Sequence, residues 1–132
     1  MSSATARPLA RTLVALALVA PLAAVPAFAH HGWSWAEGEQ TTLEGTIKTV
    51  SVAPPHPTLQ VTAADGKVWQ VDLGNPNQTA NSGFTAQSAK PGDTVTVLGN
   101  RSREPGKAHM KAVRITIAGK NYDLYPERIG TN

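Results

Sequence analysis

Four residues could bind a metal through imidazole nitrogen: His30, His31, His56 and His109. The chain contains no cysteine, so thiolate metal sites and disulfides are both excluded. Nitrogen ligands in a planar arrangement favour Cu(II), which also stands highest in the affinity series of the divalent metals. The histidines therefore point first to copper as a cofactor.

The segment before His30 decides what chemistry this residue can do. Arg7 and Arg11 precede an apolar run at residues 12–20, and residues 27–29 read Ala-Phe-Ala, the small-x-small pattern of a signal peptidase site. The run is well short of the roughly 20 residues that cross a bilayer. We expect residues 1–29 to be a cleaved secretory signal peptide and the mature protein to be periplasmic, without a membrane span. An uncleaved anchor, or a cut after Ala27 or Ala24, is the alternative.

A mature chain that begins at His30 offers two nitrogen donors from one residue, the free α-amine and the ring Nδ1. A second imidazole would complete the three-nitrogen set called a histidine brace. We expect His56 to supply it, because Pro55 and Pro57 stiffen its loop. The ordinary pKa of the amine is near 7.7–8.0, so copper must displace a proton and binding should weaken in acid.

His31 and His109 are further candidate ligands. Neighbouring residues of an extended segment point to opposite sides, so His31 would face away from His30 unless the terminus is flexible. By the same rule at most one of His109 and Met110 faces a given site, and a Met thioether would favour Cu(I). The alternatives without metal are an unliganded terminus, His56 as a turn residue, and His109 as an ordinary strand surface residue.

The rest of the chain predicts an all-β domain that positions these histidines. Apolar alternation predicts strands at residues 42–52, 58–63, 67–73, 94–99, 109–117 and 121–125. A polar stretch predicts a short helix or irregular turn near residues 77–86, capped near Asn75. This order is that of an oligonucleotide/oligosaccharide-binding (OB) barrel. We predict one domain at residues 30–132, a small five- to six-stranded OB-like barrel with one short helix between strands 3 and 4. Another small barrel or sandwich is the alternative.

Details of two strands sharpen this prediction. The alternation slips between Ile47 and Val50, which predicts a β-bulge in a long first strand, and Gly45 marks a bend. In the third strand the phasing turns Trp69 toward the core.

Two tryptophans and two arginines are further candidates for a functional role. Trp33 and Trp35 share a face if their segment is extended, and we expect them to pack on the barrel and hold the histidines in place. Stacking on a sugar or base is the alternative. Arg101 and Arg103 either hold an anion or belong to a solvated hairpin loop.

Charge and motifs exclude several classes of function. The formal charge of +3 includes Arg7 and Arg11, so the mature part is nearly balanced. It has no clustered basic face of the kind that nucleic acid requires, and we expect no nucleic-acid partner. No Gly-x-Ser-x-Gly elbow occurs, and no other catalytic constellation stands out, so we expect no enzyme.

Several short motifs occur in a recognisable order: AHHGW at residues 29–33, LEGTI at 43–47, GKVW at 66–69, GDTV at 92–95 and GNR at 99–101. In this order the chain resembles a family of small exported bacterial proteins, the domain of unknown function 6152, over nearly its whole mature length. Pro55, His56 and Pro57 stand where such proteins show Asn-Pro-His. The resemblance implies export, one β-domain and pairing of the terminal histidine with His56, and it brings no activity.

A periplasmic copper-binding protein is the function that these features favour, with His30 and His56 as ligands and His31 or His109 as additions. Its expected partners are the copper ion and a periplasmic or envelope protein. A metal-free OB-fold module that binds a saccharide, a peptide or an envelope partner is the main alternative. A copper oxygenase is less favoured, because the chain is short and its strands predict a barrel rather than a sandwich.

Overall fold

The computed structural model describes residues 3–5, 17 and 32–131. His30, His31 and most of the predicted signal peptide lie outside these residues, so cleavage after Ala29 stays a prediction. Within the described ranges, no helix has the length and apolar character needed to cross a bilayer.

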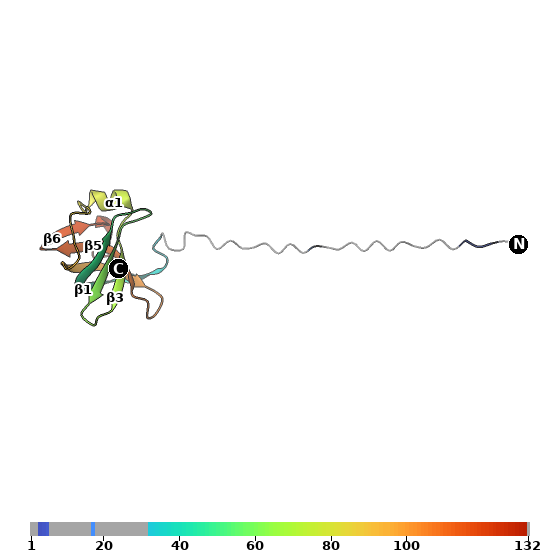
Figure 1. Ribbon diagram of the computed structural model, residues 1–132, viewed down its shortest axis with the longest axis horizontal. Helices are drawn as coiled ribbons and strands as arrows, with labels where there is room; N and C mark the ends of the chain where they lie inside the picture. Colours follow the sequence, from blue (N-terminus) through green and yellow to red (C-terminus); the bar gives the residue numbers. More distant parts are fainter. Residues whose placement is uncertain (1–2, 6–16, 18–31, 132) are drawn as a thin grey trace.

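Six strands and two short helical segments form the described domain (Figure 1). In chain order they are β1 (Ala36–Ser51), β2 (Thr58–Ala63), β3 (Val68–Asp72), α1 (Pro76–Asn81), β4 (Thr94–Ser102), β5 (His109–Ile117), β6 (Lys120–Asp123) and the 3-10 turn η2 (Pro126–Arg128). The predicted all-β class, with one short helix between the third and fourth strands, is confirmed.

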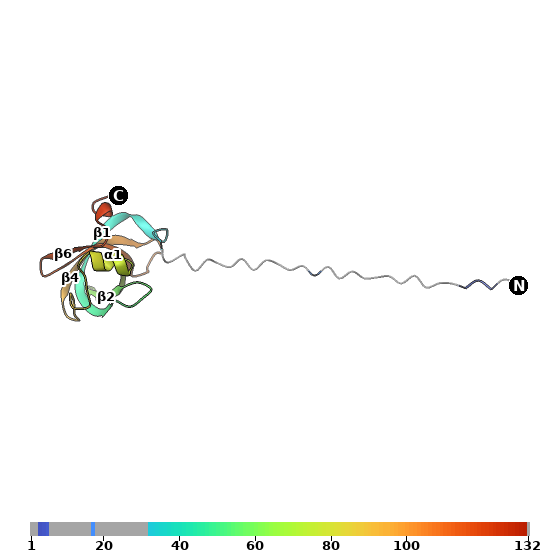
Figure 2. The ribbon, with the colours of Figure 1, turned by 90° about the horizontal axis from the view of Figure 1, so that it is seen from above.

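The strands close into a barrel. Their order in the sheet is β3-β2-β1-β4-β5-β6, and β3 also pairs with β5 in parallel, which closes a ring of five strands. β6 extends the sheet beyond β5. α1 covers one end of the ring, as the side view of Figure 1 and the view from above in Figure 2 both show. This arrangement is the predicted OB-like barrel.

The barrel interior is filled by the apolar residues whose alternation predicts the strands. Leu59 and Val61 of β2 and Val97 of β4 are fully buried. Phe84, which follows α1, packs edge-on against Tyr122 with ring centroids 5.5 Å apart. Burial of each such side chain contributes about 1.5–3 kcal/mol, so the core rather than any covalent link holds the fold together.

β1 serves both halves of the barrel. It pairs with β2 and with β4, and its register with β2 shifts between Ile47 and Thr49, which confirms the predicted bulge. Gly45 takes part in both pairings, and a Cβ there would overlap the carbonyl oxygen of Thr62. The absence of a side chain at Gly45 therefore permits a close approach of β2. Trp69 is buried in the core, as predicted.

β1 and α1 differ most from the predicted bounds. β1 begins at Ala36 rather than at residue 42, because this poorly alternating segment still pairs with the far end of β4. α1 ends at Asn81 rather than near residue 86, because Gly83 has a φ of 89° and the chain then turns to bury Phe84. The start of β1 is therefore set by pairing with a distant strand, and the end of α1 by burial of Phe84 in the core.

Candidate functional site

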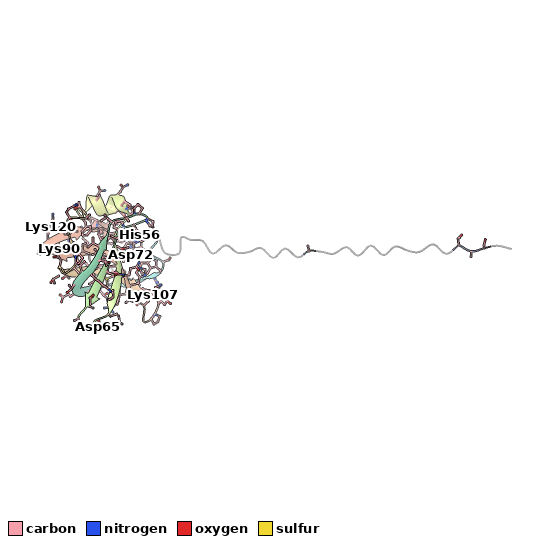
Figure 3. The ribbon with its side chains drawn as sticks, in the orientation of Figure 1. His56, Asp65, Asp72, Lys90, Lys107 and Lys120 are labelled. Carbon is pink, nitrogen blue, oxygen red and sulfur yellow. The ribbon has the colours of Figure 1, made fainter. Side chains whose placement is uncertain are left out.

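Two of the four histidines meet at one side of the barrel. His56 lies in the loop between β1 and β2, and His109 is the first residue of β5. Both line a pocket of about 340 Å³, which we call the histidine pocket. Figure 3 shows His56 and Asp72 close together on this side of the barrel. The pocket is lined by His56, Gln70, Asp72, Lys107, Ala108 and His109.

The parallel pairing of β3 with β5 brings these residues together. Its register sets Gln70 opposite His109 and Asp72 opposite Lys111. Asp72 and His109 are 37 positions apart in the sequence, and no local pattern links them. The site is therefore a product of barrel closure.

Asp72 and His109 form a buried pair. Nε2 of His109 lies 2.8 Å from Oδ2 of Asp72, and Gln70 Nε2 donates to the other carboxylate oxygen over 3.1 Å. Burial alone would raise the pKa of the Asp72 carboxyl. The hydrogen bonds from His109 and Gln70, with the charges of His109 and His56, outweigh burial and lower that pKa below its ordinary value. Asp72 is therefore an ionised acceptor at neutral pH.

This pairing orients the His109 ring as a metal-binding histidine is usually oriented. An ionised carboxylate only accepts, so the proton of a neutral His109 lies on Nε2 and the lone pair on Nδ1. Metal-ligating histidines commonly donate their second ring N–H to a carboxylate in this way. The residue is 8% exposed, so the alternative of an ordinary surface residue is wrong.

Trp33 and Trp35 pack against the barrel at this side, as expected. The Trp35 ring stacks on the His109 ring, with centroids 4.0 Å apart and planes 14° apart. Trp33 meets Tyr125 edge-on at 4.9 Å and lies under the guanidinium of Arg128 at 4.1 Å. Their segment is a bend and a turn rather than an extended strand, so the two rings contact different residues instead of sharing a face. The chain is thus fixed at the site only a few positions after His31.

The described residues do not form a complete metal site. They contain no group of three or more His, Asp or Glu side chains that could hold a metal ion. His56 and His109 are brought to one pocket, whereas the predicted ligands His30 and His31 lie outside the described residues. Met110 is fully buried in the core and does not line the pocket, which agrees with the expectation that at most one of His109 and Met110 faces a site.

Lys111 is a second buried charge beside the pocket that the sequence analysis missed. It is 7% exposed, and burial lowers the pKa of its ammonium although the charge of Asp72 opposes the shift. A usable signal existed in the sequence, because His109 and Lys111 alternate on one face of a strand whose neighbours are apolar.

The arginines of the β4–β5 region already have partners in the barrel. The guanidinium of Arg101 lies 5.1 Å from the Trp69 ring centroid, and its Nε donates to Thr41. Arg103 Nε donates to the carbonyl of Ala36 over 2.7 Å. Both line an open groove of about 290 Å³.

Comparison with solved structures supports the fold. The S. pombe Stn1–Ten1 complex aligns with a TM-score of 0.50 and 18% identity, over 61% of this chain and 59% of that chain. The mitochondrial single-stranded DNA-binding protein Rim1 of S. cerevisiae aligns at 0.48 and 12% identity, over 62% and 94% of the two chains. TiaS in complex with agmatine aligns at 0.48 and 13%, over 65% and 26%. Only the first alignment reaches a TM-score of 0.50, and at 18% identity that likeness concerns the fold alone.

Sequence comparison supplies the family. No curated protein matches the chain. The profile of the Family of unknown function (DUF6152) matches residues 17–111, which is most of the chain, and the protein therefore belongs to this family.

Proposed function

We propose that the protein binds copper in the periplasm, through the amine and ring of His30 and the ring of His56, with His109 as a further ligand. The observation that carries the proposal is the histidine pocket, where His56 and His109 line one cavity and Asp72 holds the outer nitrogen of His109. Export and cleavage after Ala29 belong to the same proposal, because only cleavage there gives His30 a free amine.

The stretch of chain between His30 and Trp33 is short. Three residues of chain span at most about 11 Å, and His30 is three positions before Trp33. Trp35 packs on His109, which lines the pocket, and Trp33 packs on Tyr125, which lines the neighbouring cavity. This supports a His30 within reach of His56 and His109.

The donor set favours copper over harder or softer ions. Two imidazoles and one amine are nitrogen donors of the kind that suit Cu(II), whereas Mg²⁺ and Ca²⁺ prefer oxygen. The Asp72 carboxylate is already bound by His109 and Gln70, so its role here is to orient a ligand. Since the described residues alone hold no group of three, the free amine of His30 is essential to the proposed site.

The test is a Cu(II) titration with electron paramagnetic resonance, on periplasmic protein whose N-terminus has been confirmed by intact mass. We expect one tightly bound copper with a spectrum of nitrogen ligands. His56→Ala should abolish tight binding, and Asp72→Asn should weaken it about 10–100-fold, the range for a carboxylate that orients a metal-binding histidine.

A matched control separates the terminal amine from the side chains. Protein with one serine added before His30 keeps every histidine but moves the amine away from the His30 ring. We expect this protein to bind copper far more weakly and to keep the same thermal stability without metal. Copper affinity equal to that of the wild type, in this variant or in His56→Ala, would refute the proposal.

A metal-free binding module remains the second candidate, favoured by the groove beside Trp69. Four basic residues line it together with that ring, namely Lys67, Arg101, Arg103 and Lys107. Two carboxylates, Glu37 and Glu104, also line it, so the excess of positive charge would suit an acidic saccharide or peptide. Binding of such a ligand that survives chelation of all metal, and is lost in Arg101→Gln, would favour this function over copper.

A further inference from the structure

Lys111 is a buried residue, 7% exposed, whose ammonium forms no ion pair with a described residue. Among the described residues its only direct contacts of a charged or polar kind are with two aromatic faces, Trp33 at 5.1 Å and Tyr125 at 5.7 Å from the ring centroids. A buried ammonium normally has a carboxylate or several acceptors close by, because desolvation of an unpaired charge is costly. Lys111 therefore leaves unused binding capacity inside the protein.

The charges around Lys111 do not compensate it. Asp72 attracts it, but the two oxygens of that carboxylate accept hydrogen bonds from His109 and Gln70. Arg128 adds a second positive charge nearby. The surroundings of Lys111 are thus short of negative charge.

A small cavity opens at this residue. Its volume is about 210 Å³, and we call it the lysine pocket. Lys111, Tyr125, Asn75, Gln78 and His56 contribute side chains to its lining. His56 is shared with the histidine pocket, so the two cavities are neighbours.

The amides of this pocket are set to donate. The Asn75 Oδ1 atom accepts from the Gln78 backbone over 2.8 Å, and Gln78 Oε1 accepts from the Asn75 backbone over 3.2 Å. The oxygens of both amides are engaged, so the NH₂ groups are what these side chains have left to offer a ligand. An ammonium and two amide donors around one cavity match an acceptor-only ligand.

We propose that the lysine pocket binds a small oxyanion, the size of acetate or phosphate, with Lys111 as its counter-charge. A cavity of this volume has room for a few heavy atoms, since one water occupies about 30 Å³ of liquid. This binding goes beyond copper handling and does not require a metal.

The test is a titration of metal-free, ¹⁵N-labelled protein at constant ionic strength. Binding is monitored through the amide chemical shifts. Sodium acetate and sodium phosphate are titrated separately, with chloride as the reference anion. We expect saturable shifts at Lys111, Gln78 and Tyr125 with at least one oxyanion. Saturation by acetate alone identifies a monocarboxylate site, and saturation by phosphate alone or by both identifies a wider oxyanion site.

Two lysine variants provide the comparison. Lys111→Met keeps a side chain of similar length and removes its charge. It should weaken oxyanion binding about 10- to 100-fold, the effect of losing one charge-assisted hydrogen bond. Lys120 also lies over a tyrosine ring, at 5.1 Å from that of Tyr122, but is exposed on another side of the barrel. Lys120→Met should therefore bind as the wild type does.

A third variant keeps the proposal testable if Lys111→Met does not fold. Gln78→Leu removes one donor and leaves the lysine in place, and it should weaken binding several-fold. Shifts that rise linearly with both anions as with chloride, or saturable binding that Lys111→Met and Gln78→Leu leave unchanged, would overturn the proposal. Because no copper is present, such a failure would leave the copper proposal untouched.

Discussion

Two sides of the barrel hold similar charged residues in different surroundings. Figure 3 shows Lys90 and Lys120 on one side and His56 and Asp72 toward the other. On the first side, which we call the β6 side, the side chains of the Arg114–Asp123 pair are 31% and 36% exposed. In the histidine pocket the corresponding values for His109 and Asp72 are 10% and 5%.

Exposed and buried ion pairs differ in what they contribute to the stability of the fold. Exposed ion pairs contribute about 0–1 kcal/mol and are common on any surface. Buried ones pay a desolvation penalty that packed apolar residues would avoid, so they are weak evidence for stability. A barrel that needed only stability could place apolar residues where Asp72, His109 and Lys111 lie. Their burial is the observation behind the proposed binding role of this side of the barrel.

The largest expected effect comes from removing the buried carboxylate. Asp72→Ala leaves the His109 N–H without its acceptor and removes the negative charge that attracts Lys111. We expect the free energy of unfolding to fall by about 3–5 kcal/mol, the range for breaking a buried pair. Asp123→Ala on the β6 side is the matched change and should cost about 1 kcal/mol or less. Urea denaturation measures both. Similar losses in the two variants would contradict the contrast between the two sides.

The next effect tests how tightly β5 is held beside the pocket. A Cβ on Gly99 of β4 would overlap the carbonyl oxygen of Lys111. Gly99→Ala should therefore displace β5 and cost about 1–3 kcal/mol, as overpacking does. Gly38→Ala is the control, because a Cβ there meets nothing within 4 Å. Equal thermal stability of the two variants would show that β5 can shift freely.

A smaller effect is expected at the aromatic stack. Trp35→Ala removes the ring from the face of His109, and such pairs contribute about 0.5–1.5 kcal/mol beyond the area that they bury. Trp35→Phe retains a stacking ring and should recover most of the loss. NMR of the His109 ring should show greater motion in Trp35→Ala than in Trp35→Phe. Unchanged ring motion in Trp35→Ala would mean that Asp72 alone holds His109.

The fold was largely predictable because its signals are local. The bounds of β2 and β5 match residues 58–63 and 109–117, since each strand alternates cleanly and has turn residues beside it. The bulge near Ile47 was visible as a slip in that alternation. The start of β1 was missed, because its first residues are placed by pairing with β4 rather than by their own pattern.

The site was only half predictable. His56 stood out by its flanking prolines, and His109 by its residue type. Asp72 was missed, because its role depends on the parallel contact of β3 with β5, which no short-range pattern encodes. Lys111 was missed although it alternates with His109 on one strand. A buried lysine also contradicts the usual rule that lysines lie at the surface, and such departures tend to mark functional positions.

The smallest expected effect concerns the exposed pair on the β6 side. The hydrogen bond from Arg114 lowers the pKa of the Asp123 carboxyl below its ordinary value. A depressed carboxyl pKa in the folded state adds stability above the unfolded pKa of about 3.9, and this is lost as the pH falls through the folded value. Exposure and salt reduce the contribution, so Arg114→Gln should cost less than about 1 kcal/mol at pH 7.

Salt and acid together distinguish this pair from the buried one. Urea denaturation of Arg114→Gln should show its deficit at pH 7 in dilute buffer, with little left in about 1 M NaCl, where the screening length falls to about 3 Å. The deficit should also shrink below about pH 4, because protonated Asp123 no longer attracts the guanidinium. The loss in Asp72→Ala should persist in 1 M salt, since its partners are shielded from solvent. A salt-resistant deficit in Arg114→Gln would mean that the two pairs are energetically alike, and burial would then no longer single out the histidine pocket.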